Sequence, residues 1–196
     1  KRKKRSEVKK LLLLWILNQE GPIGRYRLKE LMDLSEHEGI VREMLNDLKK
    51  ENFILAKRLG CSLTEKGKTF FADQMKARNI VSIKAIDSTI LTEQPINLGL
   101  HLRNQADKIE STMDIRDIAV RGGASGATII FFKQNRITIP SVHPDFLAKH
   151  PKVATIIRNS FNLSDNDVVA IIYAEDKWKA VESAITVANT LFSSKK

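Results

Sequence analysis

Apolar residues recur at helical spacing in the first third of the chain. Between residues 35 and 53, five of them fall on one side of a 3.6-residue period: Ile40, Val41, Met44, Leu45 and Leu48. This pattern predicts an amphipathic helix. Ser35 is its expected N-cap, and Glu36 and Glu38 place acidic side chains in its first turn. Phe53 begins the extended apolar run that follows the helix.

Similar patterns place three further helices and a hairpin around this segment. Helices are expected at residues 6–18, 25–34 and 65–78, and strands at 53–59 and 61–63. Gly21 and Pro22 separate the first two helices, and Gly60 with Cys61 forms the expected hairpin tip. Thr64 is the expected cap of the fourth helix. The order is therefore helix, helix, helix, hairpin, helix.

From residue 79 onward, strands alternate with helices. Strands are expected at residues 80–87, 96–102, 128–133, 136–140 and 167–173. Helices are expected at residues 103–111, 113–120, 144–159 (interrupted at His150 and Pro151) and 177–192. This order predicts a mixed α+β domain. We therefore expect an α+β protein with two domains, 1–78 and 79–196.

Two features of the first domain resemble a known family. The helices at 25–34 and 35–51 form a pair, and the hairpin ends in Leu63-Thr64-Glu65-Lys66-Gly67, a leucine-threonine-x-x-glycine segment. Residues 6–78 thereby resemble the winged helix-turn-helix family of DNA-binding domains. Residues 24–54 are also similar to archaeal winged-helix proteins that carry a C-terminal domain of unknown function. The resemblance implies a three-helix bundle with a β-hairpin and a fourth helix, and it implies binding to duplex DNA.

The charge of the chain favours a polyanionic partner. The sequence has 33 Lys and Arg against 23 Asp and Glu, a net charge of +10. Residues 1–78 account for +8 of this charge, and five positive charges lie in residues 1–5. We interpret residues 1–5 as a flexible arm that contacts phosphate, with a solvated charge run or a truncation boundary as the alternative.

The resemblance also implies which residues contact DNA. The third helix would enter the major groove, and the hairpin would lie over phosphates or the minor groove. The implied residues are Arg25, Arg27, Lys29, His37, Arg42, Asn46, Lys49, Lys57 and Arg58. Arg42 can pair bidentately with guanine and Asn46 with adenine, while the cations of the second helix and the hairpin would contact the backbone.

Acidic side chains near this helix keep a second hypothesis open. Glu36 and Glu38 would repel phosphate unless they cap the helix or accept a hydrogen bond from cytosine. The expected hairpin is also short and would reach few bases. The alternative is a protein–protein adaptor that uses the winged helix to contact another protein.

A glycine-rich segment is the most suggestive part of the second domain. Arg121, Gly122, Gly123, Ser125 and Gly126 could present backbone N–H groups and a positive charge to a small anionic ligand. The segment precedes a strand and contains no Gly-Lys-Ser/Thr, so it matches neither a P-loop nor a dinucleotide fingerprint. The alternative is a glycine helix stop that leads into the strand at 128–133.

Residues suited to catalysis or metal binding are sparse. Cys61 is the only cysteine, which excludes an internal disulfide and is compatible with a reducing cytoplasm. The four histidines lack metal-ligand spacing, and no Ser–His–Asp set or paired carboxylates can be recognised. We expect no catalytic residues, no metal and no cofactor, and a cytoplasmic location. No apolar run reaches the roughly 18 residues of a membrane span.

These observations favour a transcriptional regulator. The first domain would bind double-stranded DNA, and the second would sense a ligand or dimerise. A homodimer is expected because two half-sites double the contacts, with the strand at 80–86 or the last helix as its interface. A hypothesis from another class is an enzyme or small-molecule-binding protein with an appended winged helix, the layout of some archaeal riboflavin kinases.

Overall fold

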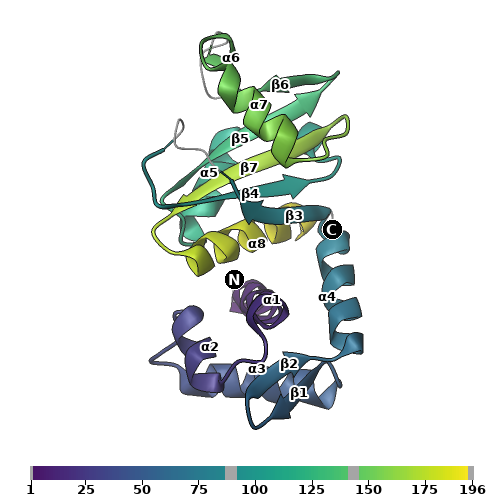
Figure 1. Cartoon of the computed structure of the whole chain (residues 1–196), viewed down its shortest axis with the longest axis vertical. Coiled ribbons are helices and arrows are strands. Elements are labelled where there is room, and N and C mark those ends of the chain that lie inside the picture. Colours follow the sequence, from purple (N-terminus) through teal and green to yellow (C-terminus); the bar gives the residue numbers. More distant parts are fainter. Residues whose placement is uncertain (1, 87–91, 141–145, 194–196) are drawn as a thin grey trace. The chain divides into compact units, whose positions relative to one another are not determined.

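The computed structural model describes residues 2–86, 92–140 and 146–193. The chain divides into two compact units, Lys1–Met75 and Lys76–Lys196. Helices dominate the first unit and a five-stranded sheet dominates the second (Figure 1). The protein is therefore mixed α+β, as the sequence pattern predicts.

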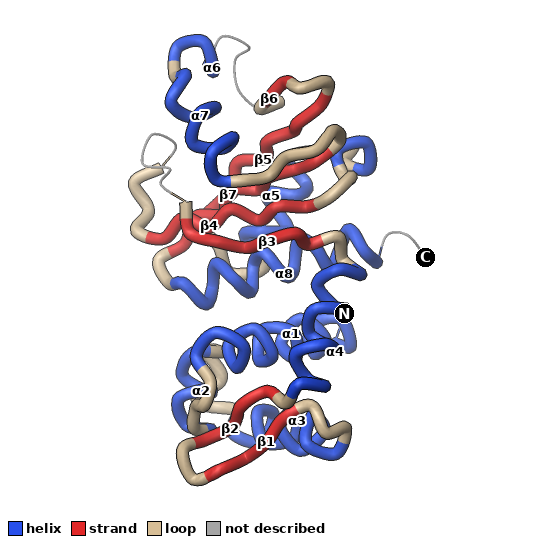
Figure 2. Tube along the Cα trace, turned by 45° about the vertical axis from the view of Figure 1, so that its right-hand side comes forward, coloured by secondary structure: helices blue, strands red, loops and turns tan. Residues whose placement is uncertain are grey.

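The first unit contains helices and a small antiparallel hairpin. Its elements are α1 (Arg2–Glu20), α2 (Arg25–Leu31), α3 (Glu38–Lys50), β1 (Ile54–Lys57), β2 (Gly60–Leu63) and α4 (Glu65–Ala77). Figure 2 shows the hairpin β1–β2 beside the helices. The order helix, helix, helix, hairpin, helix is the one predicted for this part of the chain.

Helix α1 supplies much of the core of the first unit. Leu12, Leu13, Leu14 and Ile16 are fully buried, as expected for so apolar a run. The α1 backbone lies close to β2, α2 packs on α3, and α3 packs on β1. The ammonium of Lys9 donates a 2.8 Å hydrogen bond to the carbonyl of Met32 and so caps the end of α2.

The ends of α2 and α3 depend on residues in the left-handed conformation. Asp33 has φ of 51°, and Asn52 has φ of 59°. At the first of these ends, Leu34 N–H donates to Lys29 O (2.9 Å), and at the second, Phe53 N–H donates to Leu48 O (2.9 Å). These are Schellman ends, and Asp and Asn tolerate the conformation because their short polar side chains bond locally.

These ends correct the predicted bounds of the helix pair. Helix α2 stops at Leu31 instead of residue 34, because Asp33 turns the chain. Ser35 is not the N-cap of α3, since His37 N–H bonds to Leu34 O in a turn and α3 begins only at Glu38. Glu36 thus lies before the helix. His37 occupies the N-cap position without a capping side-chain bond.

Two other expectations for the first unit are wrong. Helix α1 begins at Arg2, so residues 2–5 are helical and form no flexible arm. The hairpin tip is Arg58 and Leu59, because Lys57 pairs directly with Gly60. The predicted cap of α4 is confirmed: Thr64 Oγ1 accepts a 2.9 Å hydrogen bond from Gly67 N–H.

The second unit is a five-stranded antiparallel sheet with helices on both faces. The strands are β3 (Ile80–Ala85), β4 (Ile96–Leu102), β5 (Gly126–Lys133), β6 (Arg136–Thr138) and β7 (Asp167–Ala174), in the order β3-β4-β7-β5-β6. The helices are α5 (Thr112–Arg121), α6 (Phe146–Lys149), α7 (Pro151–Ser160) and α8 (Lys177–Ser193), with a 3₁₀ turn η1 at Ala106–Lys108. Helices α5 and α8 cover one face, and α7 covers the other (Figure 1).

Alternation along the strands explains both hydrophobic layers. Val169 and Ile171 of β7 join Val153 and Ile157 of α7 in one core cluster. The intervening residues of β7 are also buried, on the face that carries α8. A strand buried on both faces is uniformly apolar. This matches the continuous apolar run from Val168 of β7.

Most of the predicted elements of the second unit are present. Residues 103–111 are the exception, because only η1 is helical there and Gln105 and Ala106 N–H groups bond to Asn166 O. The hairpin β5–β6 turns at Gln134 and Asn135, both with positive φ, as expected. The predicted positions 87 and 144–145 lie outside the described residues. None of the described helices is long and apolar enough to cross a membrane.

Candidate functional site

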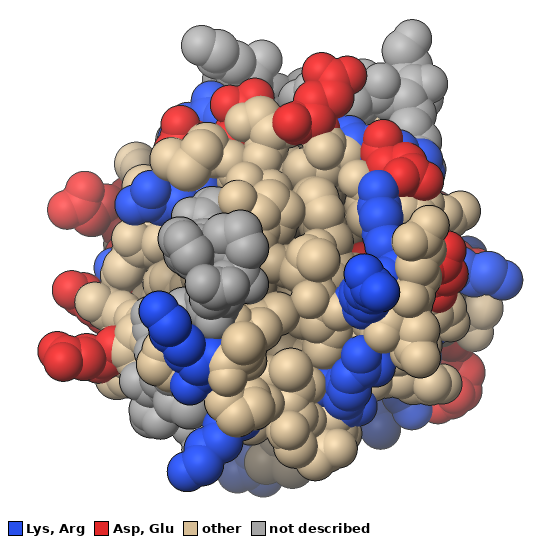
Figure 3. Space-filling view, turned by 90° about the horizontal axis from the view of Figure 1, so that it is seen from above, with Lys and Arg blue, Asp and Glu red and all other residues tan. Residues whose placement is uncertain are grey.

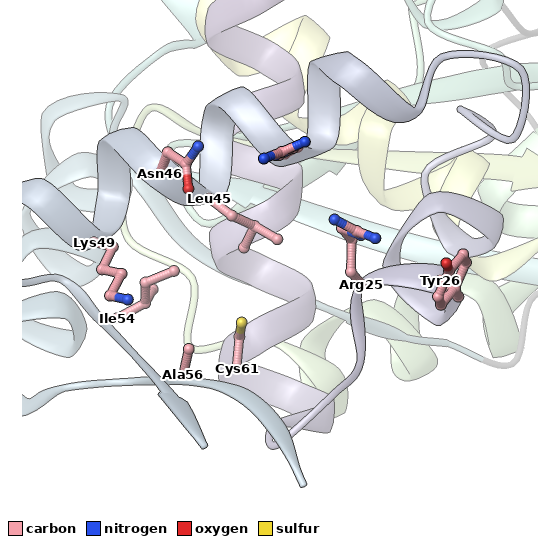
Figure 4. A pocket seen from close by; sticks show the side chains of 9 residues that line it. Arg25, Tyr26, Leu45, Asn46, Lys49, Ile54, Ala56 and Cys61 are labelled. Carbon is pink, nitrogen blue, oxygen red and sulfur yellow. The ribbon is translucent and has the colours of Figure 1, made fainter. Parts of the chain in front are cut away.

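A pocket in the first unit brings together the three elements of the predicted DNA-binding surface. It has a volume of about 400 Å³, and α2, α3 and the hairpin each contribute to its wall (Figure 4). Its nine lining residues are Arg25, Tyr26, Arg42, Leu45, Asn46, Lys49, Ile54, Ala56 and Cys61. Three are cations and none of the nine is acidic, so the pocket favours an anion.

The α3 side of the pocket follows from helical spacing. Arg42, Asn46 and Lys49 are separated by four and three residues, which places them on one side of the helix. Glu43 and Asp47 follow Arg42 and Asn46 by one residue each, and a turn of about 100° per residue directs them away from the pocket. Val41, Met44 and Leu48 are buried and fix the orientation of the helix.

The α2 side of the pocket begins at the first residue of that helix. In Figure 4, the Arg25 side chain points from α2 toward α3, and Leu45 and Asn46 of α3 line the same pocket. Gly24 precedes α2 in an extended conformation and gives it no side-chain cap.

The hairpin forms the third wall and contributes Ile54, Ala56 and Cys61. Ile23 pairs with Cys61 through two backbone hydrogen bonds of 2.8 and 2.9 Å, so the segment before α2 is fixed to β2. Gly60 has φ of 125°, and a Cβ there would collide with the Ile23 backbone. Burial raises the pKa of the Cys61 thiol, and the positive charge of Lys49 opposes that shift.

Tyr26 is a surface feature that the sequence interpretation missed. Its side chain is 65% exposed at the edge of the pocket. The Arg25 guanidinium lies 5.3 Å from the centre of its ring, and the Lys29 ammonium lies 5.2 Å from it. The exposed ring and its two neighbouring cations add an aromatic surface to the cationic edge of the pocket. The triplet Arg25-Tyr26-Arg27 was the signal that could have identified it.

The remaining predicted contact residues of the first unit lie outside the pocket. Arg27 is exposed and donates a 2.9 Å hydrogen bond to Glu30, so its charge is partly compensated. His37 is exposed at the start of α3. Lys57 ends β1 and Arg58 lies in the two-residue turn. Leu59 beside them is 79% exposed, the highest value among the large hydrophobic side chains described.

The glycine-rich segment of the second unit corresponds to a helix stop. The N–H groups of residues 122–125 all donate to carbonyls: Gly122 to Ile118, Gly123 to Val120, Ala124 to Ala119 and Ser125 to Tyr173. An anion loop needs such donors to be unoccupied. The geometry therefore does not support the expected anionic ligand at this segment.

Each predicted ligand residue of that segment has a local role. Gly122 caps α5, and a Cβ there would lie 2.8 Å from Ser183 Cα. Gly123 has φ of 104°, and Gly126 begins β5. Ser125 Oγ lies 3.4 Å from Gln94 Oε1, and Arg121 Nε donates to Asp117 O. The chain thus turns from helix to strand in four residues.

A buried polar cluster in the second unit was also missed. Asp167 and His101 are 0% and 1% exposed, and Asp167 Oδ2 accepts from His101 Nε2 (2.7 Å) and from Arg103 Nη1 (2.8 Å). The Asp167 carboxylate also accepts from the N–H groups of Asn104 and Ser164. Its acceptor capacity is filled by groups of this chain. We assign it to the architecture of the sheet, where it joins the end of β4 to the start of the central strand β7.

The second unit carries a mixture of positive and negative side chains, whereas the first unit has a cationic pocket. On the face in Figure 3, Lys and Arg side chains occur together with Asp and Glu, and neither sign dominates. No group of three or more His, Cys, Asp or Glu in the described part of the chain could hold a metal ion. The pocket of the first unit is therefore the strongest candidate site.

The comparisons with known proteins give relatives without an assigned activity. Residues 95–191 match the model of a family described as a domain of unknown function (DUF4443). None of the curated proteins that were compared matches the sequence. A hypothetical protein from Pyrococcus horikoshii OT3 is 27% identical, with a TM-score of 0.71 over 95% of this chain and 94% of that chain. The chain is thus similar over nearly its whole length to an archaeal protein, and its second unit is similar to a domain of unknown function.

Proposed function

We propose that the first unit binds duplex DNA and that the protein is a transcriptional regulator. The observation that carries the proposal is the convergence of Arg25, Arg42, Asn46 and Lys49 in one pocket whose described lining residues include no carboxylate. The element order of a winged helix and its exposed α3 face support the same function. The excess of positive charge on residues 1–78 adds sequence-independent attraction.

The contacts divide into two classes by chemistry. Arg42 and Asn46 lie on the exposed face of α3 and can pair with guanine and adenine edges in the major groove. Arg25 and Lys49 flank them and suit phosphate oxygens. Lys57 and Arg58, at the far end of the hairpin, would contact the backbone or the minor groove. The second unit would sense a ligand or dimerise, in keeping with its separate core.

The experiment that tests the proposal is fluorescence anisotropy with labelled duplex DNA and the full chain, repeated across a salt series. We expect the logarithm of the binding constant to fall linearly with the logarithm of the salt concentration. Because Arg42 is assigned to a base edge, Arg42→Ala should lower affinity for a selected site by about 5- to 150-fold, the range of one bidentate pair. Loss of a phosphate contact in Lys57→Ala should reduce the salt slope by about 0.9.

A matched control separates a DNA-binding surface from net charge. Lys68→Ala removes one positive charge on α4, where Lys68 pairs with Glu65 at 2.7 Å outside the pocket. This variant should bind almost as the parent does. Flat anisotropy for the parent at low salt would exclude DNA binding and favour the adaptor hypothesis. Equal losses of DNA affinity for Lys68→Ala and Arg42→Ala would show that the protein binds DNA only through non-specific charge attraction.

A further inference from the structure

Helix α5 carries an exposed stripe on the surface of the second unit. Met113 is 49% exposed and Val120 is 45% exposed, and the exposed charges Arg116 and Asp117 lie between them. The spacing of three, four and seven residues places all four on one side of the helix. Among the described residues of the second unit, the only other large hydrophobic side chain that is similarly exposed is Val81 of β3.

The outward direction of this stripe is fixed by the packing of the opposite side. Ile115 and Ala119 are buried, and Ser183 Oγ of α8 donates a 2.8 Å hydrogen bond to Ala119 O. Gly122 approaches α8 so closely that a Cβ there would lie 2.8 Å from Ser183 Cα. Helix α5 therefore cannot rotate to bury Met113 or Val120 within its own chain.

The stripe is complementary to itself under a two-fold axis. The midpoint between Met113 and Val120 along the helix is also the midpoint between Arg116 and Asp117. If a second α5 lies antiparallel with the axis at that midpoint, Met113 faces Val120 of the other copy. In the same register, Arg116 faces Asp117 of the other copy. A two-fold interface requires this reciprocity.

We propose that α5 pairs with α5 of a second copy of this chain, as an antiparallel two-fold contact through Met113, Arg116, Asp117 and Val120. The contact buries two apolar pairs and joins two opposite charges on each side of the axis. Its area is that of one short helix, which corresponds to a reversible dimer with a weak dissociation constant. The inference does not depend on DNA binding.

Other surfaces offer less to a second copy. Helix α8, one of the expected interfaces, is buried along most of its length and packs on β4, β7 and α5. Strand β3, the other expected interface, is an edge strand with Val81 exposed. The edge gives no self-complementary charge pair comparable to that of α5 in the described residues, so we use it as the competing site in the test.

Sedimentation equilibrium of the full chain over micromolar to millimolar concentrations tests the proposal. The parent should show a monomer–dimer equilibrium. Arg116→Asp places Asp opposite Asp, and Asp117→Arg places Arg opposite Arg, so each single variant should weaken dimerisation by about tenfold or more. The double variant Arg116→Asp/Asp117→Arg restores opposite charges and should recover most of the parent affinity. An equimolar mixture of the two single variants should form heterodimers.

The controls distinguish this interface from net charge and from other surfaces. Lys152→Asp changes the net charge as Arg116→Asp does, but on the exposed start of α7, and should leave dimerisation unchanged. Val81→Asp should also leave it unchanged. Far-UV circular dichroism verifies that each variant is folded. A parent that is monomeric throughout overturns the proposal, as does a dimer that survives the single reversals or that the double variant fails to restore.

Discussion

The side chains of His101 and Asp167 form a 2.7 Å hydrogen bond between β4 and the start of β7, and both are removed from solvent. Because an ionised carboxylate only accepts, His101 Nε2 donates. Burial lowers the pKa of His101, while the hydrogen bond and the charge of Asp167 act in the opposite direction. The imidazole is therefore held neutral by its surroundings at the centre of the polar cluster.

This relationship predicts a loss of stability in mild acid. The folded-state pKa of His101 lies below its unfolded value of about 6.5, so the unfolded chain binds a proton first as pH falls. The loss begins near the unfolded pKa and is complete below the folded one. His101→Gln keeps a donor but does not titrate. Urea unfolding between pH 8 and pH 5, in roughly half-unit steps, should show a steeper decline for the parent, and parallel profiles would contradict this assignment.

Replacing Asp167 should destabilise the second unit strongly. The Asp167 carboxylate accepts hydrogen bonds from His101, Arg103 and two backbone N–H groups. In Asp167→Asn, the side-chain NH₂ replaces one carboxylate oxygen, so a hydrogen-bond donor faces these donors. We expect a loss of about 2–4 kcal/mol in the free energy of unfolding. Trp178 fluorescence in a Trp15→Phe background reports this unit. Asp165→Asn, at an exposed carboxylate of the same loop, is the control and should cost less than about 1 kcal/mol.

The Thr64 hydroxyl joins α4 to the end of α3. It accepts from Gly67 N–H at 2.9 Å and donates to Asn52 O at 2.8 Å. Thr64→Ala should therefore cost about 1–2 kcal/mol, whereas Thr64→Ser keeps both bonds and should cost only a few tenths. Trp15, which packs edge-on against Phe71 at 5.7 Å, is the probe in a Trp178→Phe background. Equal losses in the two variants would show that the methyl group, not the hydroxyl, matters.

Gly99 is required by a close side-chain contact. A Cβ at Gly99 of β4 would collide with the ring of Phe161, which is buried in the core cluster against α7. Gly99→Ala should cost about 1–3 kcal/mol by overpacking. Phe161→Leu creates space, so the double variant should be more stable than the sum of the single effects predicts. A double-mutant cycle measures this coupling, and additive losses would contradict the contact.

Tyr26 should contribute to DNA affinity if the proposed function holds. We expect Tyr26→Ala to weaken duplex binding roughly three- to tenfold, because an exposed aromatic ring held by two cations supplies contact area and a hydroxyl. Tyr26→Phe retains the ring and isolates the hydroxyl. Anisotropy at fixed salt measures both, with Leu55→Ala, another exposed hydrophobic side chain, as the control. Unchanged affinity in Tyr26→Ala would remove this residue from the interface.

Local sequence patterns were sufficient to predict most helices and strands, because the hydrophobic residues of these elements recur with a clear helical or extended period. The apolar stripe from Ile40 to Leu48 predicted α3 and its buried face, except that Ile40 itself is 44% exposed. The alternation from Ile96 to Leu102 predicted β4. The turn between β5 and β6 was predicted from Gln134 and Asn135, and Asn135 is a residue type that tolerates the positive φ found there. The α+β class followed from the order of these elements.

The end of α2 and the start of α3 were predicted incorrectly, because the sequence signals for competing local conformations were similar in strength. Ser35 is a good N-cap by type, but Asp33 adopts the left-handed conformation and ends α2 early. Ser35 then lies inside the turn from Leu34 to His37, so it is not at the position from which it could cap α3. Asp is less typical than Gly or Asn at such an end, so its role was not expected.

The sequence by itself determined the helical and extended periods, the excess of positive charge in the first unit and the polar face of α3 that carries Arg42 and Asn46. Only the tertiary structure decided that Arg25, Arg42 and Lys49 share one pocket and that Tyr26 lies at its edge. It also decided that the N–H groups of residues 122–125 are occupied and that Asp167 meets His101 across the sheet. The reason is physical: periodicity depends on neighbours in the chain, whereas a pocket, a saturated turn and a buried ion partner depend on residues that only folding brings together.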